Sequence, residues 1–239
     1  MNEFDGGRHC YPGTNVLINT YDIRDGRVLE RLEIQKVAIK LLGLDLHPQR
    51  VKATFDIRHL KAIHEYLFGD IYEWAGEFRK ENFFKSERVL SGGSAEYANH
   101  EEIEEKLKKL LGRYKKTNWQ AVDGKTVSEF LLELWSIHPF REGNTRTCIT
   151  FLWHYLKASN VNFQVELLRN NPMYVRDSLV MANYGTEQYL VAIITDALAG
   201  SEQIPEITEN ESGRSPKEQY QISKSDYELF KEKYRINKE

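Results

Sequence analysis

Apolar residues recur every three or four positions along most of the chain, which is the period of helices that bury one face. We expect helices over residues 28–44, 96–114, 125–137, 170–185 and 186–200, and further helices that begin after Asp56, near Asn144 or Thr145, and near Ser225. In the first helix the expected apolar face is Ile34, Val37, Ala38 and Leu41, and Gly43 is expected to stop it. The pattern therefore predicts an all-α fold.

The apolar faces of the later helices predict the core of that fold. They comprise Leu60, Ile63, His64, Leu67, Phe68, Ile103, Leu107, Leu110, Leu111, Val127, Phe130, Leu131, Leu134, Trp135, Cys148, Phe151, Leu152, Tyr155 and Leu156. Asp56 is placed to cap the helix that carries the first five of these residues.

Two stretches interrupt the helical period. Residues 77–94 mix charged and aromatic residues and end in a small-residue turn, so they predict a ragged β-hairpin between two helices. Residues 200–216 hold several glutamates and no basic residue before Arg214, a composition typical of a linker. Beyond them, Ser225 and Glu228 form a capping-box pattern for a short amphipathic helix. We therefore expect a domain over residues 1–199, a linker over 200–216 and a C-terminal helical appendage over 217–239.

Composition and charge exclude several classes of protein. Of the 239 residues, 41% are hydrophobic, and the net charge of −3 gives no reason to expect nucleic acid as a direct ligand. No stretch approaches the ~20 apolar residues that span a bilayer, and the start has no apolar core of signal-peptide length. Cys10 and Cys148 fit neither a metal-ligand spacing nor a structural disulfide, which favours a reducing compartment. We expect the protein in the cytoplasm, or secreted into a host cell by a route that the sequence does not show, with no membrane partner.

The candidate chemistry lies in one polar stretch, SIHPFREGNTRT at residues 136–147. The proline after His138 ends the preceding helix there, so the imidazole is free to face a cleft. The next helix begins near Asn144, and its first N–H groups and its dipole can hold an anion together with the guanidinium of Arg146. Glu142 can hold a Mg²⁺ ion that bridges phosphates, while a histidine of near-neutral pKa can take a proton from a hydroxyl group. These residues predict phosphoryl or nucleotidyl transfer.

Each of these residues also fits an ordinary structural role. A histidine before a proline at a helix end is commonly a capping or core residue. Glu142 and Arg146 are four positions apart and could simply pair, and Asn144 could be an N-cap. The convergence of such residues between positions 138 and 146, each suited to a different part of one site, favours the site.

The stretch HPFREGNTR resembles the signature of the Fic (filamentation induced by cAMP) family, His-x-Phe-x-(Asp/Glu)-Gly-Asn-Gly-Arg-x-x-Arg. HEYLFGDIYEWAGEFR, residues 64–79, is similar to the family's Tyr-x-Trp-Ala-Gly-x-x-Arg segment, which leads into a β-hairpin flap over the active site. YPGTNVLINTYDIRD, residues 11–25, resembles the N-terminal stretch of Fic domains from bacterial toxins and secreted effectors. Together the similarities cover about residues 11–199 and leave 200–239 uncovered.

The resemblance implies a Fic fold, which is a helical core with a small β-hairpin flap, and a protein adenylyltransferase activity. Such an enzyme moves AMP from ATP to a Ser, Thr or Tyr hydroxyl of a target protein and releases pyrophosphate. His138 would be the general base, Phe140 would anchor the loop in the core, and Glu142 would bind Mg²⁺. The anion hole and phosphate site would be formed by Gly143, Asn144, Thr145 and Arg146.

The flap, about Arg79 to Arg88, would hold the target segment by strand addition, so backbone contacts would place the hydroxyl. The flap residues assigned to target positioning are Arg79, Lys80, Phe83 and Lys85. For one of Phe83 and Phe84, simple core packing is the preferred interpretation.

The sequence departs from the family signature at two positions. Thr145 replaces the second glycine of the signature, which would cost on the order of 1–3 kcal/mol if the position needs a positive φ, and nothing if it is helical. Ile149 replaces the second arginine, so a charge-assisted phosphate contact worth about 1.5–3 kcal/mol is absent. The two changes would weaken nucleotide use without removing His138, Glu142 or Arg146.

Regulation follows from the same resemblance. Many Fic proteins carry an inhibitory helix with the motif Ser/Thr-x-x-x-Glu-Gly/Asn, whose glutamate pairs with the second arginine of the signature, and this sequence contains no such motif. The resemblance then implies a small antitoxin-like inhibitor that acts in trans, or a weakly active enzyme without restraint. A homodimer is also compatible with the sequence.

Three functions stay open at the level of sequence. The first is the adenylyltransferase, with ATP as substrate and Mg²⁺. The second is a Doc-like protein kinase, in which an inverted nucleotide gives up its γ-phosphate; the altered residue Thr145 leaves room for it, although Doc proteins usually have lysine there and a shorter chain. The third is a catalytically impaired binding module that uses the flap and the C-terminal helix, which failure to bind nucleotide would support.

Overall fold

Helices α4 (Gly124–Ile137) and α5 (Asn144–Ala158) form the centre of the fold, because apolar neighbours cover them on most sides. The computed structural model describes residues 9–200 and 220–236. Every residue of α5 from Thr147 to Leu156 is buried, as expected for a helix that is surrounded by others. Helices α2 and α6 pack on α5, while α3, α7 and α8 pack on α4.

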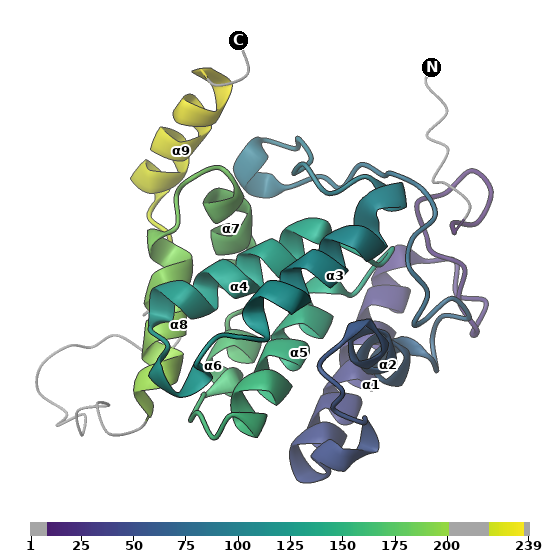
Figure 1. The fold of residues 1–239 in the computed structure, drawn as a ribbon. Coiled ribbons are helices and arrows are strands. Elements are labelled where there is room, and N and C mark those ends of the chain that lie inside the picture. Colours follow the sequence, from purple (N-terminus) through teal and green to yellow (C-terminus); the bar gives the residue numbers. More distant parts are fainter. Residues whose placement is uncertain (1–8, 201–219, 237–239) are drawn as a thin grey trace, which may run out of the picture.

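The other helices surround this pair. Figure 1 shows α1 and α2 on one side of α4 and α5, and α8 and α9 on the opposite side. Their bounds are α1 Gly26–Leu46, α2 Ile57–Phe68, α3 Ile103–Tyr114, α6 Val165–Asn170, α7 Pro172–Asn183, α8 Gln188–Ala199 and α9 Lys224–Ile236. Short 3-10 helices lie at Pro48–Arg50 (η1), Arg88–Leu90 (η2), His100–Glu102 (η3) and Trp119–Ala121 (η4). Within the described residues the fold is helical and has no β-sheet, which confirms the predicted all-α class.

Most of the predicted core is confirmed. The apolar residues predicted between Leu60 and Leu156 are all buried. Asp56 caps α2 as predicted, because its carboxylate accepts a hydrogen bond from the backbone N–H of His59.

The predicted end of α1 is wrong, and its predicted face is only partly right, because Val37 is buried and Leu41 packs against the core but Ala38 is exposed. The helix continues past Gly43 to Leu46, and it buries Leu29, Glu33, Val37 and Leu44, whereas Ile34 is 57% exposed. A glycine inside a helix costs only about 1 kcal/mol. At Gly43 a β-carbon would lie 2.7 Å from the Tyr66 hydroxyl, so the glycine allows close packing of α1 on α2.

The β-hairpin predicted over residues 77–94 is also wrong in its strands. The chain reverses there, but the pairing is limited to one isolated bridge between Ser86 and Ser94. Val89 and Leu90 turn into the core within η2, and this burial replaces the alternation that a hairpin strand requires. We call residues 77–94 the flap segment below.

Helix α9 packs on the flap segment, but its predicted cap is wrong. Ser223 rather than Ser225 accepts the hydrogen bond from a first-turn N–H, that of Asp226, at 3.1 Å. Tyr227 then accepts a hydrogen bond from Nη2 of Arg88 in η2 at 2.9 Å, and Phe230 is buried. The linker predicted over residues 200–216 lies, apart from Gly200, outside the described residues.

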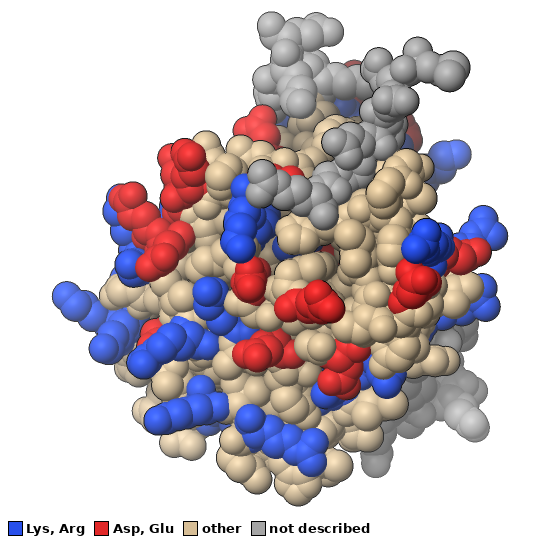
Figure 2. Space-filling view, turned by 90° about the vertical axis from the view of Figure 1, so that its right-hand side faces the viewer, with Lys and Arg blue, Asp and Glu red and all other residues tan. Residues whose placement is uncertain are grey.

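Two further expectations concern membranes and cysteines. Among the described residues, no helix combines the length and the apolar character needed to cross a bilayer. Cys10 and Cys148 are both buried and do not form a disulfide. Acidic and basic side chains are interspersed over the face drawn in Figure 2.

Candidate active site

The loop between α4 and α5 carries the candidate chemistry, and the chain enters it through a strained residue. α4 ends at Ile137 and His138 adopts a left-handed conformation with φ of 50°, which directs the chain out of the helix axis. Arg79 holds this turn, since its Nε donates to the carbonyl of His138 at 2.8 Å and its backbone N–H donates to the carbonyl of Pro139 at 2.9 Å. Arg79 is only 4% exposed, so its guanidinium supports the loop from within rather than facing a target.

The His138 imidazole is arranged as a neutral base. Its Nδ1 lies 3.2 Å from the carbonyl oxygen of Trp135, and because a carbonyl only accepts, Nδ1 carries the proton. Nε2 therefore presents its lone pair, and this buried atom has no hydrogen-bond partner among the described residues. Burial, reinforced by the positive charges of Lys85 and Arg176, lowers the pKa of His138 well below 6.5. The Tyr97 ring stacks on the imidazole at 3.8 Å between centroids and fixes its plane.

Gly143 and Asn144 shape the start of α5. Gly143 has a φ of +77°, and a β-carbon there would collide with the ring of Phe68. The Asn144 side chain does not cap the helix: its Oδ1 accepts from the N–H of Phe140 at 2.9 Å and its Nδ2 donates to the carbonyl of Phe140 at 2.7 Å. The backbone N–H groups of Asn144, Thr145 and Arg146 consequently have no acceptor among the described residues. They face outward at a helix N-terminus, where an anion is stabilised.

Glu142 precedes this anion site and is held by a lysine from the flap segment. Lys85 Nζ lies 3.0 and 2.8 Å from the two carboxylate oxygens of Glu142. Burial raises the pKa of Glu142, but the charges of Lys85 and Arg146 outweigh it and hold the pKa below its usual range. The carboxylate is therefore ionised and already binds one cation. No group of three or more His, Cys, Asp or Glu side chains that could hold a metal occurs in the part of the chain that the structure describes.

Arg146 is tied to a residue that sequence reasoning missed. Its Nη2 donates to Oε1 of Glu33 at 2.6 Å, and the other carboxylate oxygen of Glu33 accepts from the Tyr72 hydroxyl at 2.5 Å. The sequence did contain a sign of this ion pair. Glu33 lies on the same face of α1 as the buried residues Leu29 and Val37, and a buried carboxylate requires a charged or hydrogen-bonding partner.

His64 is a second residue whose role was missed, since it was assigned only to the core. Its Nδ1 accepts from the N–H of Gly76 at 2.8 Å, so Nε2 is protonated and donates to the carbonyl of Glu142 at 3.0 Å. Its ring also stacks on Phe140 at 3.9 Å, which anchors the loop in the core.

Thr145 lies in the first turn of α5 and has an ordinary helical backbone, so it fits without strain. Its hydroxyl accepts hydrogen bonds from Nε1 of Trp135 at 3.0 Å and from Nη1 of Arg176 at 3.3 Å. Arg176 comes from α7, and no local pattern in the sequence pointed to it. The buried side chain of Ile149 follows one turn later on α5.

The remaining flap residues divide between the site and the solvent. Phe83 lies 5.9 Å from the imidazole of His138, ring centroid to ring centroid, whereas Phe84 is 65% exposed. The Lys80 side chain is exposed and pairs with Glu77. The backbone N–H groups of residues 82–84 make no hydrogen bond within the described residues.

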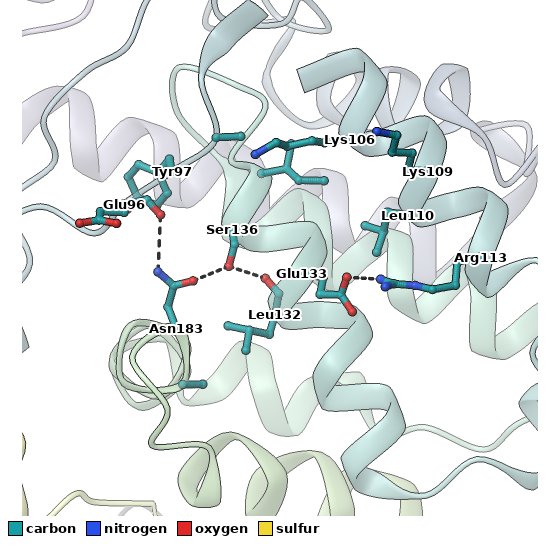
Figure 3. A pocket seen from close by; sticks show the side chains of 13 residues that line it. Glu96, Tyr97, Lys106, Lys109, Leu110, Arg113, Leu132, Glu133, Ser136 and Asn183 are labelled. Atoms are coloured by element: carbon teal, nitrogen blue, oxygen red, sulfur yellow. Dashed lines mark hydrogen bonds and ion pairs between the residues drawn. The ribbon is translucent and has the colours of Figure 1, made fainter. Parts of the chain in front are cut away.

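A hollow of about 640 Å³ lies beside the site (Figure 3). Lys106 and Lys109 line it from α3, and Ser136 of α4 donates to Asn183 of α7 at 2.8 Å on its opposite wall (Figure 3). Tyr97 also lines this hollow, so one ring separates it from His138.

The sequence is similar to a known protein family and to several named proteins. Residues 54–156 match the Fic/DOC family. The protein adenylyltransferase VbhT of Bartonella schoenbuchensis is 29% identical over 200 residues, which cover 81% of this chain and 40% of VbhT. The probable protein adenylyltransferase y4lH of Sinorhizobium fredii is 32% identical over 151 residues, which cover 60% of this chain and 71% of that protein. The chain thus spans less than half the length of VbhT.

Solved structures have the same fold. The type IV secretion system effector protein BepA aligns with a TM-score of 0.69 at 24% identity, over 88% of this chain and 76% of BepA. BepC of Bartonella tribocorum, solved with bound AMPPNP, aligns with a TM-score of 0.67 at 23% identity, over 79% of this chain and 95% of that one.

Proposed function

Because the chain belongs to the Fic/DOC family, we propose that it is a protein adenylyltransferase that moves AMP from ATP to a hydroxyl of a target protein and releases pyrophosphate. The observation that carries the proposal is the buried Nε2 of His138, which has no hydrogen-bond partner in the described part of the chain, in the loop that leads to the N-terminus of α5. Such a lone pair can accept the proton of a hydroxyl, and the helix terminus can hold the phosphate that the hydroxyl attacks.

In this reaction His138 acts as the general base. Nε2 takes the proton of the target hydroxyl while the oxygen attacks the α-phosphorus, and the bond from that phosphorus to the β-phosphate oxygen breaks. The hydrogen bond from Nδ1 to the carbonyl of Trp135 keeps the correct tautomer and stabilises the imidazolium that forms.

The start of α5 binds the phosphates. The N–H groups at the start of α5 would contact the phosphates, and the guanidinium of Arg146 would join them once it exchanges part of its pairing with Glu33. Glu142 would hold Mg²⁺ together with phosphate oxygens, in place of Lys85, which fits an ion usually bound by one or two carboxylates plus substrate. Bound there, the ion would neutralise charge on the leaving pyrophosphate.

The target segment would align along residues 82–84 of the flap segment. Their N–H groups, which have no acceptor within residues 9–200 and 220–236, allow the addition of an extended chain, and Phe83 beside His138 would be displaced or repacked as the hydroxyl enters. Lys80 would contact the target at the exposed edge, whereas Arg79 would act by holding the motif loop.

A transfer assay tests the proposal. ATP labelled at the α- or the γ-phosphate is offered with Mg²⁺ to a bacterial or host lysate, with His138→Ala as the matched variant. We expect α-label on protein that is lost in the variant. Transfer of γ-label alone would make the chain a Doc-like kinase, and no transfer together with no ATP binding in calorimetry would leave only the binding-module function.

The partners and setting proposed for this enzyme follow from the same assignment. It would act in a cytoplasm, either its own or that of a host cell, because several structurally similar Bartonella proteins are VirB-translocated effectors. A small antitoxin-like protein would inhibit it in trans, and the hollow beside Tyr97 offers such a protein a surface next to His138. Ile39, Leu42 and Leu46 on α1 form an exposed apolar stripe that a homodimer would use, which light scattering can test.

A further inference from the structure

We propose that Arg176 binds the outer phosphates of the nucleotide at this site, and that Glu87 of the flap segment masks Arg176 until the nucleotide arrives. The inference rests on the proposed nucleotide chemistry and adds to it a residue from outside the motif loop.

The first observation behind this proposal is the position of Arg176. Its Nη1 lies 3.3 Å from the hydroxyl oxygen of Thr145, whose own N–H is among the unpaired groups at the start of α5. Its Nη2 also lies 3.3 Å from the hydroxyl of Tyr97, whose ring stacks on His138, so the guanidinium lies near the imidazole as well as the anion site. A phosphate group held by the start of α5 would therefore lie within reach of this guanidinium.

The loop between α4 and α5 supplies little free positive charge for the outer phosphates, so a further cationic residue is needed. A nucleoside triphosphate brings several negative charges, and Arg146 is already shared between Glu33 and Glu142, at 2.6 and 3.8 Å. The side chain one turn further along α5 is the apolar Ile149, which cannot bind phosphate. Arg176 brings a planar fork of donors to the same end of α5 from a different helix.

The guanidinium is held in place before any ligand binds. Its carbon lies 5.2 Å from the ring centroid of Trp135, and Thr145 receives hydrogen bonds from both residues. The Arg176 side chain is only 19% exposed. An arginine that is already ordered loses less conformational entropy when it binds a ligand, so phosphate contacts made here are stronger.

Glu87 now occupies the donors that a phosphate would need. Its Oε2 lies 3.1 Å from Nε of Arg176, and its Oε1 accepts from Nη2 of Arg176 and from the hydroxyl of Tyr97. Glu87 belongs to the flap segment, two residues after Lys85, which holds Glu142. One movement of this segment would therefore free the proposed magnesium ligand and the proposed phosphate ligand together.

Calorimetric titration with ATP, ADP and AMP, each with Mg²⁺, tests the inference on the full chain. Arg176→Met should weaken ATP and ADP binding about 10- to 100-fold, as expected for the loss of a charge-assisted contact, and should leave AMP binding within about 2-fold. Glu87→Gln should tighten ATP binding several-fold, because the mask is removed while Tyr97 keeps a partner.

Arg169→Met is the matched control. Arg169 of α6 is similarly buried, stacks on Trp153 and pairs with Asp45. It lies near the C-terminal end of α5, away from the proposed phosphate site. The variant should leave all three affinities unchanged. Arg176→Lys, which keeps the charge and loses the fork, should fall between the wild type and Arg176→Met, and thermal melting of each variant reports its folding.

Equal ATP affinity in Arg176→Met and Arg169→Met would overturn the inference, and so would an equal loss of AMP and ATP binding in folded Arg176→Met. If ATP binding depends on Arg176 but no label is transferred to protein, the inference stands and the proposed reaction fails. If label is transferred with the same KM for ATP in Arg176→Met, the reaction stands and the inference fails.

Discussion

The two ends of α5 carry similar sets of side chains with different consequences. At the N-terminal end Arg176 stacks on Trp135 and pairs with Glu87, and the buried His138 has an unpaired Nε2. At the C-terminal end Arg169 stacks on Trp153 and pairs with Asp45, and the buried His154 likewise has an unpaired Nε2 among the described residues.

Helix polarity separates the two ends. The N-terminal end of α5 presents N–H groups without an acceptor among the described residues and the positive end of the helix dipole, so a further guanidinium there adds to an attraction for anions. Arg169 instead lies in the last turn of α6, where the dipole favours a cation, and it meets a second carboxylate, Glu166, at 3.1 Å. If Arg176 binds phosphate as proposed, the comparison teaches that a buried arginine–tryptophan pair serves a ligand only where the surrounding backbone also favours the ligand's charge.

Replacing the buried histidine at each end of α5 should give the largest difference in transfer rate between the two ends. His138→Gln should slow label transfer about 10²- to 10⁴-fold, because no general base remains. His154→Gln should leave the initial rate within about 2-fold, since among the described residues the His154 imidazole forms a hydrogen bond only with His59, through Nδ1. Similar losses of rate in two folded variants would remove the distinction between the ends.

Two glycines with left-handed backbones can separate the effect of displacing the loop from the effect of general instability. Gly143 has a φ of +77° against the Phe68 ring, and Gly185 has a φ of +82° with open space around its α-carbon. Backbone strain should cost either alanine variant about 1–2 kcal/mol of folding stability, and at Gly143 the collision with the Phe68 ring should add to this cost. Gly143→Ala should also displace the loop and slow transfer about 100-fold, while Gly185→Ala should not. Melting curves and initial rates on both variants measure the two effects, and a loss of rate in Gly185→Ala would point to general instability.

The pH dependence of transfer should report the buried state of His138. Because its pKa is lowered well below 6.5, the imidazole stays neutral, and therefore basic, as the pH falls from 7.5 through 6.5. The rate constant per bound substrate should stay flat across that range and fall only at lower pH. A profile that loses half its rate near pH 6.5 would show a solvent-exposed base instead.

The smallest effect concerns stability at the C-terminal end. His59 and His154 each have a pKa lowered to about 4, chiefly by burial, against 6.5 for the unfolded chain. Unfolding therefore takes up protons, so their contribution to stability is full above pH 6.5 and is lost as the pH falls toward 4. His154→Gln should reduce the fall in melting temperature between pH 7 and pH 5 by a few degrees. An unchanged slope would mean that other groups control the acid sensitivity.

Local patterns in the sequence were enough to predict the helical core and the position of the loop. The apolar period located α2 to α5, because each of these helices buries one wide face, and Pro139 located the end of α4. The charged residues of the loop lie next to one another in sequence, so they could be recognised before any fold was known.

Partners that meet only in the fold could not be predicted in this way. Glu33 reaches Arg146 across 113 positions, and Arg176 reaches Thr145 across 31, so each pairing depends on how helices pack rather than on spacing. α6 has six residues, too few to show a period. In the flap segment the burial of Val89 and Leu90 overrides the strand pattern that its composition indicates.

The contact between α9 and the flap segment sets an order of assembly during synthesis. Arg88 bonds to Tyr227, which lies 139 positions later in the chain, so the ribosome completes α1 to α8 before this contact can form. Local helical contacts form quickly, whereas contacts across long stretches of chain form late. A nascent protein would thus form the loop between α4 and α5 before it forms the contact that holds α9 on the flap segment.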